Sequence, residues 1–245
     1  MQIGFIGAGN MAGALARGWG EPVLCTDSGS GRAAALTEEL GGEALASNAE
    51  LARTADLVIL AHKPAQLEEV AAEAAPHARR VISVLGGTDL ATLRAAYPGA
   101  SVARVEPNTP VALRAGVCAL AAESDDLEAT RELFARLGTV VEVPEKLMVV
   151  AGGVSGVGPA YFALVAEAWV DAAVRHGMPA AQALALVRGT MAGTAAQLEA
   201  GDGDTLSLRR AVASPGGSTA RGLAALERGG LRNALGDAMD AVVDG

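Results

Sequence analysis

Aromatic residues, lysine and cysteine are all scarce in this chain of 245 residues. Aromatic side chains make up 3% of it, although hydrophobic residues make up 51%, so the core is expected to consist of alanine and aliphatic side chains. An alanine removes little apolar area from water, and alanine-rich helices therefore favour a partner subunit that adds buried surface. Lysine occurs only at positions 63 and 146, so a lysine inside a motif is informative.

The shortage of basic residues and of cysteine excludes further classes of protein. The net charge is −9 and no run of lysine and arginine occurs, so we expect no nucleic-acid partner. Cys25 and Cys118 lie far apart without a CxxC pattern, which argues against a disulfide framework and against a metal site. With an N-terminus that lacks the basic region of a signal peptide, these features predict a cytoplasmic protein.

Charged residues are also missing from residues 147–166, a stretch as long as a membrane span. Four glycines and Pro159 interrupt this stretch. We therefore predict a buried segment with a break in it, and no membrane partner.

Short apolar runs alternate with helical patterns in the first half of the chain. The predicted strands cover residues 2–6, 22–26, 56–61, 80–84 and 101–105, and the predicted helices cover 10–19, 31–40, 65–75 and 90–96. Residues 117–121 and 139–143 can add two strands around a helix over 125–137. This alternation predicts an α/β domain in which a mostly parallel sheet carries helices on both faces.

The pattern changes after Pro144, because no convincing strand follows. Apolar residues recur at helical spacing in residues 159–175 and 180–199, and two more helical stretches flank residues 214–219. The sequence thus predicts an α/β domain over residues 1–144 and an all-α domain over residues 145–245.

The first predicted strand runs directly into Gly7-Ala8-Gly9-Asn10-Met11-Ala12, the GxGxxG/A pattern of dinucleotide-binding folds. Gly7 permits the tight turn, Gly9 lets the backbone approach a pyrophosphate, and Ala12 lets the helix pack against the strand. The helix N-terminus offers free N–H groups to the phosphates. The pattern therefore predicts a Rossmann-type domain that binds NAD(H) or NADP(H).

The second predicted strand ends at Asp27, where an acid commonly binds the ribose 2′-hydroxyl of NAD and repels the 2′-phosphate of NADP. Ser28, Ser30 and Arg32 follow, and these residues can hold that phosphate. Asp27 and Ser28 can equally begin an ordinary turn. These residues leave the choice of coenzyme open.

Two other loops follow strands at the same edge of the sheet, where open α/β sheets bind ligands. In Ala61-His62-Lys63-Pro64, Pro64 is expected to start a helix. Lys63 is a candidate for contacting ribose, nicotinamide or substrate, with a solvated lysine as the alternative, and His62 is interpreted as a solvated side chain. In the second loop, residues 107–110, Asn108 can face the nicotinamide ring or merely stabilise a turn.

Residues 214–219 read Ser-Pro-Gly-Gly-Ser-Thr between two helical stretches. The two glycines allow backbone geometries that a Cβ forbids, and Ser218 and Thr219 are predicted to begin the next helix. Free N–H groups and hydroxyls at a helix start suit a small carboxylate. An ordinary helix cap is the alternative, but two glycines and three hydroxyls exceed what a cap needs, which favours an anion site.

Six motifs, in this order and over nearly the whole chain, resemble those of the pyrroline-5-carboxylate reductase family. They are GAGNMA at 7–12, KP at 63–64, PNTP at 107–110, EKLM at 145–148, SGVGPAY at 155–161 and VASPGGST at 212–219. The resemblance implies hydride transfer from NAD(P)H, with NADPH slightly preferred, to the ring C=N carbon of 1-pyrroline-5-carboxylate. The product would be L-proline, in the last step of proline biosynthesis. It also implies a homodimer through the helical domain, in many members a pentamer of dimers.

The same resemblance assigns roles to individual residues. Thr219, whose hydroxyl would reach the ring nitrogen, and Lys63 are the candidate catalytic residues. The candidate substrate-binding residues, acting mainly through backbone N–H groups, are Ser214, Gly216, Gly217, Ser218 and Thr219. The candidate coenzyme-binding residues are Gly7, Ala8, Gly9, Asn10, Met11, Ala12, Asp27, Ser28, Arg32, Asn48, Ala61, Lys63, Pro64, Asn108 and Thr109.

Some positions depart from the family pattern. Glu106 stands where methionine usually precedes PNTP, Val157 replaces a small polar residue, and Arg114 stands where glycine is preferred. The alternatives are a reductase of another cyclic imine and a non-catalytic nucleotide-binding relative. A hydroxy-acid oxidoreductase ranks lower, because its helical domain would carry a catalytic lysine and here holds only Lys146.

Overall fold

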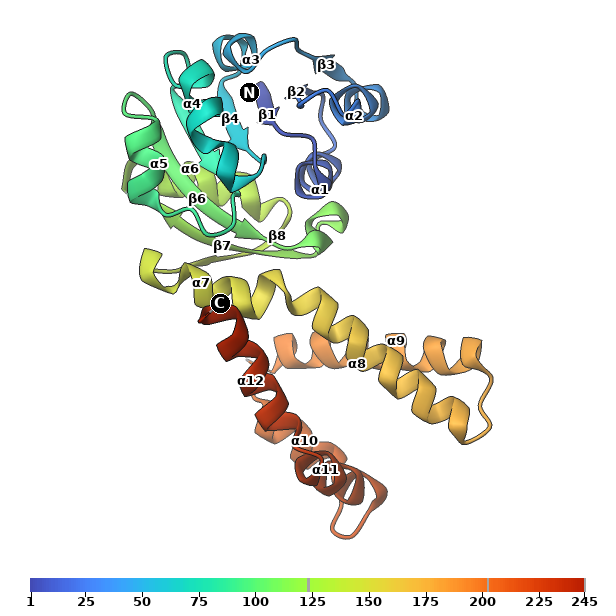
Figure 1. Ribbon diagram of the computed structural model, residues 1–245. Helices are drawn as coiled ribbons and strands as arrows, with labels where there is room; N and C mark the ends of the chain where they lie inside the picture. The colour runs from blue at the N-terminus through green and yellow to red at the C-terminus, as the bar shows by residue number, and fades with distance from the viewer. Residues whose placement is uncertain (123, 202, 245) are drawn as a thin grey trace. The chain divides into compact units, whose positions relative to one another are not determined.

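The computed structural model describes residues 1–122, 124–201 and 203–244 and divides into two compact units, Met1–Pro159 and Ala160–Gly245 (Figure 1). Each unit is described by itself. The sequence predicts a boundary after residue 144, whereas the first unit continues to Pro159. The reason is that residues 145–159 pack on the first unit: Met148 is fully buried in its core, and Ser155 accepts a hydrogen bond from Asn108.

The described residues of the first unit form a sheet of eight strands in the order β3-β2-β1-β4-β5-β6-β7-β8. All neighbouring pairs are parallel except β6 and β7, which are antiparallel. Every residue of β1, β2 and β4 is buried, as expected for strands covered on both faces. The mostly parallel α/β sheet is confirmed. The strands are β1 (Ile3–Ile6), β2 (Val23–Thr26), β3 (Gly42–Ala44), β4 (Leu57–Leu60), β5 (Arg80–Ser83), β6 (Ser101–Pro107), β7 (Gly116–Ala122) and β8 (Gly138–Glu142).

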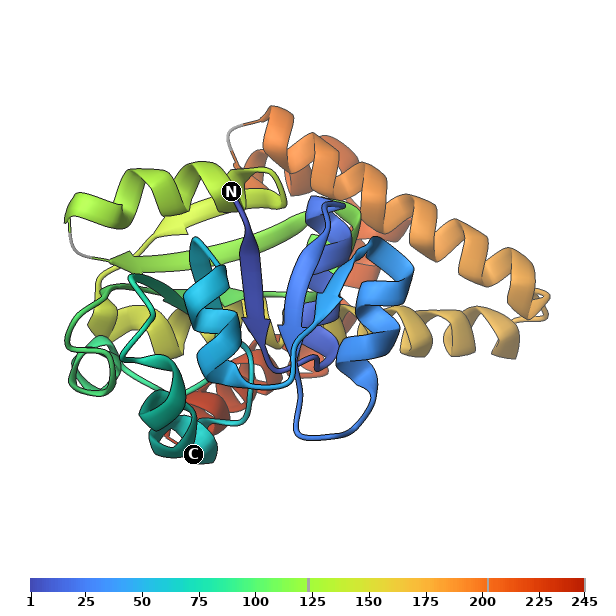
Figure 2. The same ribbon diagram turned by 90° about the horizontal axis from the view of Figure 1, so that it is seen from above.

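Helices cover both faces of this sheet (Figure 2). One face is covered by α1 (Asn10–Trp19), α2 (Arg32–Leu40) and α6 (Ser124–Ala135). The other face is covered by α3 (Asn48–Thr54), α4 (Leu67–Ala74), α5 (Leu90–Ala96) and α7 (Met148–Ala151). Short 3₁₀ helices occupy η1 (Pro64–Gln66), η2 (Thr109–Leu113) and η3 (Glu145–Leu147). Three of the few aromatic side chains meet in the core between the sheet and α1, α2 and α6, where Trp19 contacts Phe5 and lies edge-on to Phe134.

The sequence leaves β3 and α3 unassigned. The three residues of β3 are all exposed and show no apolar pattern. α3 has seven residues and begins with a capping arrangement, in which Ser47 Oγ accepts from the Glu50 N–H at 3.2 Å and the Glu50 carboxylate accepts from the Ala46 N–H. Elements this short carry too few apolar positions for a periodicity to be recognised.

The described residues of the second unit form helices joined by short connections, and they form no strand, as predicted. Its helices are α8 (Gly158–Arg175), which begins at the end of the first unit, α9 (Ala180–Ala200), α10 (Thr205–Val212), α11 (Ser218–Arg228) and α12 (Leu231–Val243). The sequence predicts two helical stretches around residues 214–219 and assigns no helix to the residues of α12.

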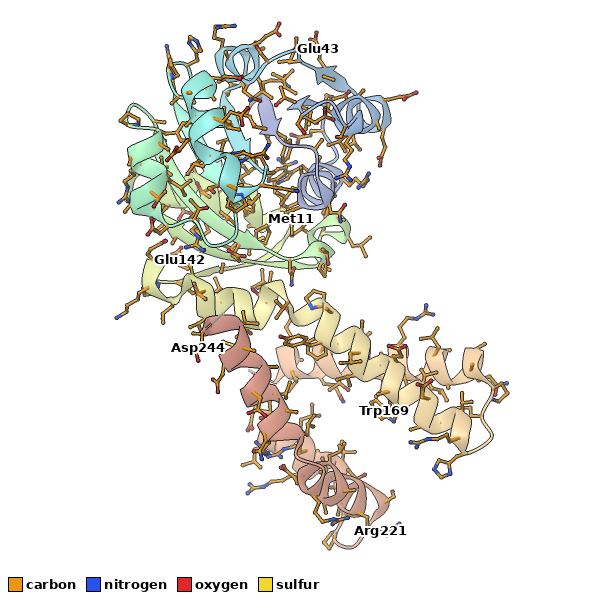
Figure 3. The ribbon with its side chains drawn as sticks, viewed as in Figure 1. Met11, Glu43, Glu142, Trp169, Arg221 and Asp244 are labelled. Atoms are coloured by element: carbon orange, nitrogen blue, oxygen red, sulfur yellow. The ribbon has the colours of Figure 1, made fainter. Side chains whose placement is uncertain are left out.

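The predicted break in the uncharged stretch is confirmed, because a π-helical turn, η4 (Gly152–Gly156), separates α7 from α8. The predicted burial is wrong for this chain. Phe162 and Leu164 are each 64% exposed and Trp169, which projects from α8 in Figure 3, is 53% exposed. The helical run Glu145–Arg175 is long and apolar enough to span a membrane by length and composition, and only 17% of its most apolar part is buried. An apolar sequence indicates that a helix will be covered, but not by which molecule.

Candidate functional site

A cleft of about 600 Å³ lies at the carboxyl ends of β1, β2 and β4. β1 lies between β2 and β4, so the cleft marks the point where the strand order reverses, the usual ligand position in open α/β sheets. The predicted coenzyme-binding residues that line it are Gly7, Ala8, Gly9, Asp27, Ser28, Arg32, Asn48, Ala61 and Lys63. The predicted residues that do not line it are Asn10, Met11, Ala12, Pro64, Asn108 and Thr109.

The two glycines of the first loop differ in their surroundings. Gly7 has a φ of +99°, and a Cβ there would lie 2.7 Å from backbone atoms of Ala61 and His62. Gly9 is the N-cap of α1 with φ −76°, and a Cβ there would have no atom within 4 Å. Ala12 is fully buried, Met11 packs partly against the core, and the remaining pattern residues are at least partly exposed. Gly7 is therefore required by the fold, while Gly9 leaves free space at a helix N-terminus.

The Asp27 carboxylate is occupied by its own loop. One oxygen accepts from the N–H groups of Gly29 (2.7 Å) and Ser30 (3.0 Å), and the other accepts from the Ser30 hydroxyl (3.0 Å) and the Ala33 N–H (2.8 Å). The Ala33 N–H contributes most to a lowered pKa of Asp27, so the group is a carboxylate at neutral pH. The loop that presents Ser28 and Arg32 is thus held in place by Asp27.

The loop after β4 forms another wall of the cleft. Pro64 is the first residue of η1, as predicted for a helix start, and the Lys63 N–H donates to Gln66 Oε1 at 3.3 Å. Lys63 is exposed and lines the cleft. His62 also lines it, so its interpretation as a merely solvated side chain does not describe its position.

Asn108 lies outside the cleft and is only 7% exposed. Its Oδ1 accepts from the Val117 N–H at 2.8 Å, and its Nδ2 donates to the Ser155 carbonyl at 3.1 Å. Both the oxygen and the nitrogen of the Asn108 amide therefore form hydrogen bonds within the protein. This agrees with the alternative in which Asn108 stabilises a turn. Thr109 is exposed and starts η2.

Glu106, which departs from the family pattern, interacts with the buried cation Arg104, and Glu145 interacts with the same cation. Arg104 is 3% exposed, and its guanidinium lies 2.9 Å from Glu145 Oε1 and 3.6 Å from Glu106 Oε2. Burial raises the pKa of Glu106, and Arg104 opposes part of that rise. Glu106 is thus accommodated by an ion pair within the first unit.

The SPGGST segment forms the start of α11 in the second unit. Gly216 has φ +71°, a conformation that favours glycine, and Gly217 is the N-cap of α11 with no side chain accepting from the first turn. A Cβ at Gly217 would meet the Ser214 hydroxyl. The helix begins at Ser218, as predicted.

The donors at this helix start are the first N–H groups of α11. The Gly217 N–H donates to the Ser214 carbonyl at 3.0 Å, so it is not free for a ligand. The N–H groups of Ser218, Thr219 and Ala220 have no intrahelical acceptor, because a carbonyl four residues earlier would lie outside the helix. Arg221 donates to the Gly216 carbonyl at 2.7 Å and brings a positive charge to the segment; Figure 3 shows it on α11.

Both parts of the chain match known protein families. A family model described as pyrroline-5-carboxylate reductase dimerisation matches residues 145–245, and one described as NADP oxidoreductase coenzyme F420-dependent matches residues 2–87. A pyrroline-5-carboxylate reductase of Synechocystis is 37% identical over 254 residues, covering 98% of this chain and 95% of that protein. The chain belongs to the pyrroline-5-carboxylate reductase family.

Solved structures of pyrroline-5-carboxylate reductases have the same fold. The enzyme from Streptococcus pyogenes gives a TM-score of 0.89 at 30% identity, covering 100% of this chain and 97% of that one. The Plasmodium falciparum enzyme, solved with NADP bound, gives 0.87 at 28% identity, covering 100% and 96%. The resemblance inferred from the six motifs is confirmed.

Sequence reasoning missed several cleft residues. They are Ile6, Thr26, Ala46, Ser47, His62, Gln66, Glu69, Val70 and Glu73. One signal was present: Ser47-Asn48-Ala49-Glu50 has the S-x-x-E spacing of a capping box. It predicts a helix start, and α3 does begin at Asn48, whose Oδ1 accepts from the Thr26 hydroxyl at 2.7 Å.

Proposed function

We propose that this chain catalyses the NAD(P)H-dependent reduction of 1-pyrroline-5-carboxylate to L-proline, the last step of proline biosynthesis. The match of 98% of the chain, at 37% identity, to a named reductase carries this proposal. The cleft of the first unit and the helix start of the second supply sites for a dinucleotide and for a small carboxylate.

The cleft fits a nicotinamide dinucleotide. The open space beside Gly9 lies at the N-terminus of α1, where N–H groups and the helix dipole favour a pyrophosphate. Lys63 extends from the loop after β4 as a cation for the coenzyme or the substrate. When bound, the reduced coenzyme supplies the hydride that the imine accepts.

The hydrogen bonds of Asp27 favour NADPH over NADH. A carboxylate that selects NAD must be free to accept from the ribose 2′-hydroxyl, whereas both Asp27 oxygens are engaged by the loop. The same loop directs Ser28 and Arg32 to the cleft, and Arg32 pairs with no carboxylate among the described residues. A guanidinium and a hydroxyl are suitable partners for a 2′-phosphate.

An Arg32→Ala variant is therefore expected to bind NADPH roughly 10- to 100-fold more weakly, the range for loss of a charge-assisted hydrogen bond. Its affinity for NADH should change less than about 2-fold, because NADH has no 2′-phosphate. Fluorescence titration of both coenzymes measures this difference. Equal losses for the two coenzymes would contradict a 2′-phosphate site at Arg32.

The start of α11 supplies the substrate site in this proposal. The N–H groups of Ser218, Thr219 and Ala220, with the Ser214 and Ser218 hydroxyls, bind the substrate carboxylate, and the Thr219 hydroxyl contacts the ring nitrogen. Because none of these groups is a strong acid, positioning of the imine accounts for much of the catalysis.

The test of the activity is oxidation of NADPH and NADH by the wild-type chain with DL-1-pyrroline-5-carboxylate and, separately, with its six-membered ring homologue. We expect turnover with the five-membered ring. Turnover confined to the larger ring would identify a reductase of another cyclic imine. Coenzyme binding without turnover of either imine would identify a non-catalytic relative.

The exposed apolar face of the second unit favours a homodimer, and we propose that this dimer resides in the cytoplasm. Only Ala183 and Val187 are buried among the described residues of this unit, whereas Leu164 and Trp169 are more than half exposed. A second copy of the helical unit, rather than lipid, covers this face, because the matching family model describes dimerisation. The net charge of −9 disfavours nucleic acid. The dimer can assemble further into a decamer.

A Leu164→Asp/Trp169→Asp variant is expected to lose the dimer, because two carboxylates would be buried without partners at the interface. Light scattering after size-exclusion chromatography should give at least twice the chain mass for wild type and the monomer mass, or an unfolded chain, for the variant. Leu113→Asp, at a side chain 83% exposed in the first unit, is the matched control and should remain assembled. An assembled Leu164→Asp/Trp169→Asp variant would place the interface elsewhere.

A further inference from the structure

His62 carries a polar atom for which the protein provides no partner. It follows β4 directly and lines the cleft. Its Nε2 is buried and makes no hydrogen bond to any residue that the structure describes. Such an atom usually has a partner in the complete complex, since leaving it unpaired costs stability.

The other ring nitrogen fixes the tautomer. Nδ1 lies 2.9 Å from the Lys63 carbonyl oxygen, and a carbonyl only accepts, so Nδ1 carries the hydrogen. Burial lowers the pKa of His62, which keeps the ring neutral near pH 7. Nε2 is then an acceptor with an unshared lone pair, and its missing partner is a donor.

The position of His62 indicates which part of a dinucleotide supplies that donor. A Cβ at Gly7 would lie 2.7 Å from backbone atoms of Ala61 and His62, so these residues pass close to the loop that leads to the pyrophosphate site. Asp27, Ser28 and Arg32 lie after β2, on the other side of β1. In a fold of this kind the adenosine half lies on the β2 side, so the β4 side receives the mononucleotide that carries nicotinamide. The donors nearest the pyrophosphate in that half are the ribose hydroxyls.

We propose that His62 Nε2 accepts a hydrogen bond from a hydroxyl of the nicotinamide ribose, and so positions that half of the coenzyme. This inference rests on the proposed coenzyme site in the cleft. His62 is a binding and positioning residue, and no proton transfer is assigned to it.

Two substitutions separate this role from a purely structural one. In His62→Asn the side-chain amide can still donate to the Lys63 carbonyl, but it places no acceptor where Nε2 lies. In His62→Gln the longer side chain can bring its carbonyl oxygen to that point. If the role of His62 is purely structural, asparagine should restore it. If the role is to bind the coenzyme, glutamine should restore it.

Three ligands locate the contact within the coenzyme. NADPH is the complete coenzyme. The fragment 2′-phospho-ADP-ribose keeps the second ribose but lacks nicotinamide, and 2′,5′-ADP lacks both the second ribose and nicotinamide. We expect His62→Asn to weaken the binding of NADPH and of 2′-phospho-ADP-ribose by the same factor, roughly 3- to 10-fold for the loss of one neutral hydrogen bond. Its affinity for 2′,5′-ADP should equal that of wild type. His62→Gln should bind all three within about 2-fold of wild type.

Calorimetric titration of the full-length variants, with thermal unfolding as a folding control, gives these affinities. A loss confined to NADPH would move the contact to the nicotinamide ring and overturn the assignment to ribose. Equal losses for all three ligands, or no loss for any, would overturn a contact in the nicotinamide half. Failure of wild type to bind NADPH would instead refute the proposed coenzyme site, so the two failures are distinguishable.

Discussion

A Gly9→Ala variant is expected to bind NADPH roughly 10- to 100-fold more weakly than wild type and to unfold at the same denaturant concentration. The added methyl group meets no protein atom within 4 Å, and the φ of −76° suits alanine. It would, however, occupy the space into which the pyrophosphate fits, and overpacking of a close contact costs about 1–3 kcal/mol. Urea unfolding and fluorescence titration measure the two effects.

Gly7→Ala is the matched comparison within the same loop, and it should behave in the opposite way. Its Cβ would lie 2.7 Å from the backbone of Ala61 and His62, at a φ of +99°, so the fold itself is strained. We expect a loss of about 2 kcal/mol or more in the free energy of unfolding. If Gly9→Ala bound NADPH as tightly as wild type does, the pyrophosphate could not lie against Gly9.

Thr219→Ala is expected to lower kcat for 1-pyrroline-5-carboxylate roughly 100-fold or more, the scale on which a misplaced reacting group lowers the rate. Thr219 is half-buried in the first turn of α11, where the N–H groups have no intrahelical acceptor. The affinity for NADPH should not change, because Thr219 is not among the residues that line the coenzyme cleft. Steady-state oxidation of NADPH, with a separate titration of the coenzyme, measures both quantities.

Two further variants control this experiment. Thr219→Ser keeps the hydroxyl and should recover most of the activity. Thr205→Ala removes a threonine from the first turn of α10, outside the SPGGST segment, and should leave kcat unchanged. An active Thr219→Ala enzyme would assign the ring nitrogen to another partner, such as water.

The features that sequence reasoning predicted depend on contacts close in the chain. The buried strands β1, β2 and β4 are short runs of aliphatic residues, and Gly7 and Ser218 stand where a strand ends and where a helix begins. In each case the signal lies in the residue types of a short local segment, so a single sequence is sufficient. The same reasoning placed nine coenzyme candidates around one cleft.

The features that it left open or missed depend on where a side chain points. Asp27 could have faced a ribose or its own loop, and the four hydrogen bonds that decide this require the conformation of residues 28–33. Asn108 could have faced a ligand or the protein, and its partners Val117 and Ser155 are distant in sequence. His62 differs from a solvated histidine only through the burial of Nε2. None of these orientations is encoded in a local pattern.

The exposed apolar surface of the second unit has a consequence for the whole chain. A unit in which only Ala183 and Val187 are buried among the described residues removes little apolar area from water by itself, so in the proposed homodimer much of its folding free energy would come from association. Stability then follows the law of mass action: dilution favours the unfolded helical unit, and a higher concentration of chains raises the melting temperature. The amount of this protein that a cell makes would therefore help to determine the fraction that is folded.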